Sequence, residues 1–105
     1  MNLIQGTVDV MILKSVSQVP MHGFGISKAI RERSNGILGL EDAALYQALH
    51  RLENRGLLES EWGLSDNNRR AKFYQLTGEG RVRLRRETEA WRRYSMAVSR
   101  VLELT

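Results

Sequence analysis

The sequence predicts a mainly α-helical domain with one small β-hairpin, and three observations support that fold class. Apolar residues recur with helical spacing in three consecutive segments of the first half of the chain. From Leu57 to Leu76 the period shortens to two residues, which is typical of a pair of strands. A long amphipathic segment follows. With 105 residues, the chain has the size of one domain with a modest core.

Two helices are expected in the first third of the chain, over residues 3–18 and about 22–34. The first is apolar around more than one face, which predicts burial between two neighbouring elements. The second should follow a turn at Pro20, with His22 as a turn or capping residue, and should end at Asn35-Gly36. Its inner side is predicted to consist of four apolar residues, namely Phe24, Ile26, Ala29 and Ile30.

The third predicted helix is amphipathic, with Asp42 as its expected N-cap and Gly56 at its end. On a helical wheel, its apolar residues fall on one face: Leu45, Ala48, Leu49 and Leu52. The opposite face, with Tyr46 on its flank, holds Ala43, Gln47, His50 and Asn54. We expect that second face to remain free for a partner.

Two strands are expected on either side of a turn cluster at Ser65–Asn68. In the first strand, Leu58, Ser60 and Trp62 alternate with acidic residues, and Trp62 is expected to pack under the hairpin. A basic cluster follows the turn and is interpreted either as a phosphate contact or as a solvated loop. It consists of Arg69, Arg70 and Lys72.

Thr77 is the expected N-cap of a last helix over about residues 78–104. Its seam has alternating spacings of four and three residues: Leu84, Thr88, Trp91, Ser95, Val98 and Leu102. A helix of about 40 Å is too long to be covered by so small a body, which indicates a partner. We therefore expect a symmetric homodimer whose interface includes Leu84, Trp91, Tyr94, Val98 and Leu102.

Together these elements predict a winged helix-turn-helix over residues 1–76 that continues into a dimerisation helix over residues 77–105. In that arrangement the third helix enters the major groove of DNA, and the hairpin, or wing, reaches phosphates or the minor groove. The formal net charge of +4 suits an anionic partner such as double-stranded DNA.

Four motifs resemble the PadR family of bacterial transcriptional regulators, in its short form with a single C-terminal helix: GTVDVMILK, PMHGFGI, LYQALHRLENRGLL and NNRRAKFYQLTGEG. They occur in the family order and cover almost the whole chain. The resemblance implies a dimer that binds operator DNA, usually as a repressor. It also implies, for some members, a small aromatic or cationic effector at the dimer interface.

The resemblance also implies roles for single residues. Tyr46 matches a recurrent tyrosine of the recognition helix, so either a DNA contact or packing against the wing is expected there. Gln47 stands where many members carry proline, and its amide is able to read adenine. Phe24 and Ala44 lack hydroxyl groups that many members have. Trp91 matches an aromatic position that lines the interface pore of drug-sensing relatives, and is either interface core or a ligand contact.

The expected DNA-contacting set is therefore Ala43, Ala44, Tyr46, Gln47, His50, Arg69, Arg70 and Lys72. His50 is equally well interpreted as an exposed polar residue. Two other functions remain open, a protein-binding winged-helix adaptor and a small-molecule-responsive sensor. The adaptor remains open because residues 41–56 carry three acidic and two basic side chains. A steep loss of affinity with salt would favour DNA over protein as the partner.

Other classes of protein lack support in the sequence. The absence of cysteine excludes a disulfide framework, a thiolate metal site and a cysteine nucleophile. Two histidines argue against a zinc site, and no metal, cofactor or catalytic residue is expected. The longest uninterrupted apolar run, Val10 to Leu13, is far shorter than a membrane span. Because a signal-peptide pattern is also absent, a cytoplasmic location is expected.

Overall fold

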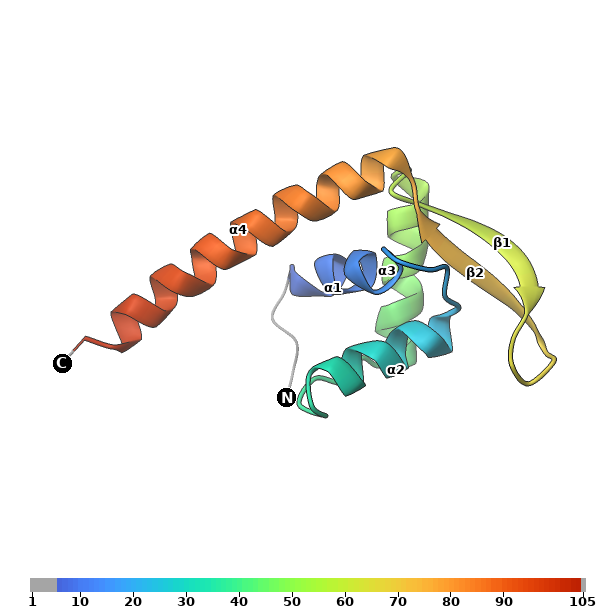
Figure 1. The fold of residues 1–105 in the computed structure, drawn as a ribbon, viewed down its shortest axis with the longest axis horizontal. Coiled ribbons are helices and arrows are strands. Elements are labelled where there is room, and N and C mark those ends of the chain that lie inside the picture. Colours follow the sequence, from blue (N-terminus) through green and yellow to red (C-terminus); the bar gives the residue numbers. More distant parts are fainter. Residues whose placement is uncertain (1–5, 105) are drawn as a thin grey trace.

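The computed structural model describes residues 6–104, which form four helices and a two-stranded antiparallel sheet (Figure 1). In chain order the elements are α1 (Thr7–Ser15), α2 (Gly23–Arg33), α3 (Asp42–Asn54), β1 (Leu58–Leu64), β2 (Arg70–Leu76) and α4 (Gly78–Leu102). The predicted fold class is confirmed. None of the helices within residues 6–104 combines the length and the apolar character needed to cross a membrane.

The first helix is shorter than predicted. Gly6 has a φ of 93° and is the N-cap of α1, so the helix begins only at Thr7. The predicted residues 3–5 lie outside the described part of the chain. Burial between neighbours is confirmed, since α1 contacts α2, α3 and α4. The side chains of Ile12 and Leu13 are fully buried there.

The core lies where α1, α2 and α3 meet the base of the hairpin. All four predicted core residues of α3 are among its buried members, which are Ile12, Leu13, Val16, Ile26, Ile30, Leu40, Leu45, Ala48, Leu49, Leu52, Leu57, Leu58, Tyr74 and Leu76. The predicted N-cap of α3 is wrong by one residue. Glu41 occupies that position in an extended conformation, and Asp42 is the first helical residue. Its carboxylate still lies in the first turn, where the helix dipole favours it.

Both predicted ends of α2 are confirmed. The Nδ1 atom of His22 accepts a hydrogen bond from the Gly25 N–H at 3.0 Å, and Asn35 and Gly36 follow the helix with positive φ. The predicted inner position of Phe24 is wrong, because its side chain is 73% exposed. Two residues correspond to about 200° around a helix, so burial of Ile26 turns Phe24 toward solvent.

The strands β1 and β2 pair in a register that sets Leu58 opposite Leu76 and Trp62 opposite Lys72. Residues just before α2 cover the outer edge of β2, through two backbone hydrogen bonds between Met21 and Tyr74. The predicted packing of Trp62 under the hairpin is wrong, since its side chain is 57% exposed. The indole instead lines a groove between the hairpin and the beginning of α2.

The long helix α4 begins as predicted, with the Thr77 Oγ1 accepting a hydrogen bond from the Gly80 N–H at 3.0 Å. Its first turns pack against α1 and β2, and Leu84 reaches the core. The rest of α4 extends away from the other elements (Figure 1). The described structure therefore measures 55 Å in its longest direction and only 29 and 22 Å across.

Candidate nucleic-acid interface

The outer face of α3 carries five of the predicted contact residues. All five are exposed, on the side opposite the buried leucines: Ala43, Ala44, Tyr46, Gln47 and His50. The phenol of Tyr46 is 54% exposed and leans on the beginning of α2. A Cβ atom added at Gly23 would lie only 2.8 Å from the Tyr46 hydroxyl oxygen. The bare backbone of Gly23 thus makes room for the ring, and the outer face of α3 remains open.

Two of the three basic wing residues have no ion-pair partner in the described part of the chain. Arg69 and Arg70 are exposed, and neither has a carboxylate within ion-pair distance among residues 6–104. The turn before them is tightly bonded, with the Ser65 N–H donating to the Arg69 carbonyl at 2.8 Å. Asn68 has a φ of 62°, a conformation that asparagine tolerates well. Near its tip the wing therefore holds two guanidinium groups whose charge no carboxylate of residues 6–104 neutralises.

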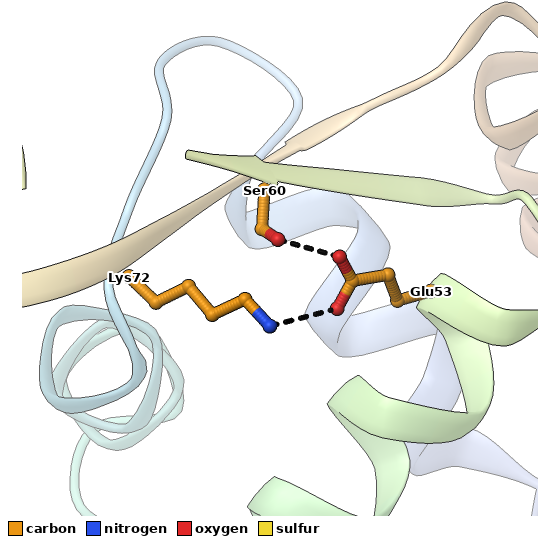
Figure 2. Close-up of polar contacts among 3 residues, drawn as sticks. All are labelled: Glu53, Ser60 and Lys72. Atoms are coloured by element: carbon orange, nitrogen blue, oxygen red, sulfur yellow. Dashed lines mark hydrogen bonds and ion pairs between the residues drawn. The ribbon is translucent and has the colours of Figure 1, made fainter. Parts of the chain in front are cut away.

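The third basic residue, Lys72, points back toward α3 instead. Figure 2 shows Glu53 of α3 between Ser60 of β1 and Lys72 of β2. The Ser60 hydroxyl donates to Glu53 Oε2, and the Lys72 ammonium donates to Glu53 Oε1 at 3.3 Å. We call these three residues the Glu53 clasp. One carboxylate joins both strands of the wing to α3.

The clasp changes the acidity of its carboxyl group. The hydrogen bond from Ser60, together with the hydrogen bond and charge of Lys72, holds the pKa of Glu53 below its ordinary value, although burial opposes the shift. Sequence reasoning missed Glu53 and Ser60. The one available signal was Ser60 itself, a polar residue at a position where the strand pattern predicts an inward side chain.

The substitution Glu53→Gln should reveal the clasp through the pH dependence of stability. At pH 7 we expect the free energy of unfolding to fall by about 1 kcal/mol, because a partly buried charge-assisted contact is lost. Because the pKa of Glu53 is lower in the folded protein than the unfolded value of 4.5, its ionised carboxylate stabilises the protein at pH values above 4.5. That stabilisation disappears as the pH falls through the pKa of the folded state. The difference between variant and wild type should therefore vanish in acid.

Urea unfolding at pH 7 and in acid would measure this difference. The matched control is Glu59→Gln. It removes an exposed carboxylate of β1, which accepts a hydrogen bond from the Gln75 amide and has no ion-pair partner in the described structure. If Glu53→Gln lowers the free energy of unfolding equally at both pH values, the proposed stabilising role of the ionised Glu53 carboxylate is wrong.

A groove of about 910 Å³ separates the wing from the beginning of α2. Four basic side chains line it against one carboxylate, that of Asp66; they are Lys28, Arg69, Arg70 and Lys72. Three exposed aromatic rings also line it, namely Phe24, Tyr46 and Trp62. Positive charge beside flat apolar rings suits a sugar-phosphate backbone. Lys28 and Trp62 were absent from the sequence-predicted set, although Lys28 follows Phe24 at the helical spacing of four residues.

The predicted interface residues of α4 divide into two groups. Leu84 packs partly against the core of its own chain. The other four are exposed: Trp91, Tyr94, Val98 and Leu102. The rings of Trp91 and Tyr94 lie 6.1 Å apart between centroids. This apolar end of α4 has no cover within residues 6–104.

Comparisons with known proteins agree with this architecture. Residues 12–86 match the family model described as the transcriptional regulator PadR-like family. An uncharacterised protein of Lysinibacillus sphaericus is 31% identical over 91 residues, which are 86% of this chain and 83% of that protein.

Two solved structures show the same fold. One, a transcriptional regulator from Clostridium thermocellum, has a TM-score of 0.83 at 29% identity and covers 92% of this chain and 94% of its own. The other, a PadR family transcription regulator from Clostridium difficile, has a TM-score of 0.80 at 29% identity, with coverages of 92% and 99%. The resemblance in the four sequence motifs is thereby confirmed.

Proposed function

Because the chain belongs to the PadR-like family of transcriptional regulators, we propose that this DNA-binding protein is a repressor that binds an inverted-repeat operator as a homodimer. One observation supports the proposal most directly. Tyr46, on the flank of the exposed face of α3, lines the same basic groove as the guanidinium groups of Arg69 and Arg70. A duplex could meet both at once, with a phosphate backbone between them.

We assign sequence recognition to α3. Its N-terminal half would lie in the major groove, where the Gln47 amide is able to donate to and accept from one adenine. Ala43 and Ala44 permit close approach of the helix, and His50 lies one turn after Tyr46 on the exposed side. Arg69 would bind phosphate. Lys72 would act by positioning the wing, because the Glu53 carboxylate already neutralises its charge.

We assign dimerisation to residues 77–105 and DNA binding to residues 1–76, as parts of one continuous fold. The uncovered apolar end of α4 supports this division, since such a surface is typical of an interface. A two-fold dimer would read two half-sites about one helical turn apart. The adjacent Trp91 and Tyr94 rings favour a second role, that of sensing a planar aromatic effector. We place the protein in the cytoplasm, with its DNA target.

A pair of substitutions would test the assignment of roles. We expect Gln47→Ala to change the preferred base at one operator position, at a cost of about 1–3 kcal/mol. We expect Arg69→Ala to weaken binding to all duplexes alike and to reduce the salt slope by about one unit.

Selection from a random DNA pool, followed by binding titrations at several salt concentrations, would measure both effects. Arg86→Ala serves as the control, because Arg86 is an exposed arginine of α4 outside the groove. A selected sequence unaffected by Gln47→Ala, together with a salt slope unaffected by Arg69→Ala, would overturn the proposal.

A further inference from the structure

We propose that Trp62 is itself a DNA-contacting residue, which covers deoxyribose in the minor groove and holds the Arg70 guanidinium there. This inference rests on the proposed DNA-binding function. It adds a contact at the flank of each half-site, outside the bases assigned to α3. This contact would favour half-sites flanked by A·T-rich sequence, where the minor groove is narrow.

The first support is the position of Trp62 on the sheet. The register places Leu58, Ser60 and Trp62 on one face of β1, with Leu76, Tyr74 and Lys72 opposite them on β2. At the base this face is buried, and in the middle the Glu53 clasp ties it to α3. Trp62 continues the same face beyond Ser60, where it is 57% exposed and borders the basic groove.

The second support is the contact between Trp62 and Arg70. The guanidinium carbon of Arg70 lies 4.6 Å from the centroid of the Trp62 ring, across the strand pair on the same face. A cation over an indole face is attracted by the ring quadrupole, which restricts the long arginine side chain without neutralising it. The guanidinium thus retains its full charge and its donors for a partner.

The three basic wing residues therefore have three different surroundings. Lys72 pairs with Glu53, Arg70 lies over Trp62, and Arg69 belongs to the turn with its side chain free among the described residues. Arg70 is the first residue of β2 and lies diagonally across from Trp62 on the same face, whereas Arg69 precedes the strand and does not lie over the indole. Because of this difference, we assign Arg69 to a DNA phosphate and Arg70 to the minor groove of DNA.

The chemistry of the minor groove fits the pair. Its walls are deoxyribose rings, whose apolar edges suit an indole, and its floor attracts arginine most strongly where A·T pairs narrow it. With α3 in the major groove, the wing of this fold reaches the adjacent minor groove. Trp62 and Arg70 share one face of the wing, and both line the basic groove of the protein that Tyr46 of α3 also lines.

The test uses the full-length protein and its selected operator, flanked by either A·T-rich or G·C-rich segments. Wild type should bind the A·T-flanked duplex about tenfold more tightly. Both Trp62→Ala and Arg70→Ala should reduce that ratio to within about twofold. Trp62→Ala should leave the salt slope unchanged, because it removes no charge. Arg69→Ala is the matched control: it removes the same charge as Arg70→Ala and should keep the flank preference.

Two outcomes would overturn the inference alone, namely an operator selected without any flank preference, or a preference that survives Trp62→Ala. Failure to select any operator would overturn the proposed function as well. Circular dichroism would verify the fold of each variant, which an exposed substitution should leave intact.

Discussion

The substitution Gly80→Ala is expected to lower the free energy of unfolding by about 3 kcal/mol. A Cβ atom at residue 80 would lie 2.1 Å from the carbonyl oxygen of Leu57 and 3.1 Å from a methyl group of Leu76. The Leu57 carbonyl is backbone, and it already accepts a hydrogen bond from the Thr77 N–H at 3.2 Å. To relieve the clash, the beginning of α4 has to move away from the wing.

Gly78→Ala provides a matched control for this effect. Both glycines belong to the first turn of α4, but a Cβ atom at residue 78 would meet nothing within 4 Å. Alanine there should change the free energy of unfolding by no more than about 1 kcal/mol, in the stabilising direction that helix propensity favours. Urea unfolding of the two variants measures the difference. Equal stabilities would show that the close approach of α4 to Leu57 does not constrain the fold.

The substitution Val98→Glu is expected to dissociate the proposed dimer and to weaken operator binding at least about 100-fold, or about 2.8 kcal/mol. Val98 is 38% exposed and lies seven residues after Trp91, on the same side of α4. In a dimer, two symmetry-related carboxylates would enter an apolar contact without partners. Each monomer would then retain only one half-site of contacts.

Met96→Glu is the corresponding control, because it makes the same charge change on the opposite side of α4. Met96 is 57% exposed, and two residues of helix separate it from Val98 by about 200°. Sedimentation at micromolar concentration should find Met96→Glu dimeric and Val98→Glu monomeric. A wild-type protein that sediments as a monomer would contradict the dimer, as would a Val98→Glu variant that remains dimeric.

The α3 face and the N-terminal caps of α2 and α4 were predictable from sequence because both depend on short-range geometry. A helix repeats every 3.6 residues, so Leu45, Leu49 and Leu52 had to share a face whatever that face contacts. The caps at His22 and Thr77 each bond a backbone N–H three residues later, so they too are local. The motif LYQALHRLENRGLL similarly indicated the family that the comparisons confirm.

The sequence by itself thus determined the order of elements, the core face of α3, the caps of α2 and α4, and the family. Only the tertiary structure decided which pattern residues are covered. Phe24 and Trp62 are exposed at the groove between α2 and the wing, and the local sequence pattern does not show which apolar residues the packed elements cover. Lys72 binds Glu53, 19 residues away in the chain, because α3 packs on β1 and β1 pairs with β2, which brings the two charges together. Local periodicity sets the direction of a side chain, whereas contacts between distant segments set what that side chain meets.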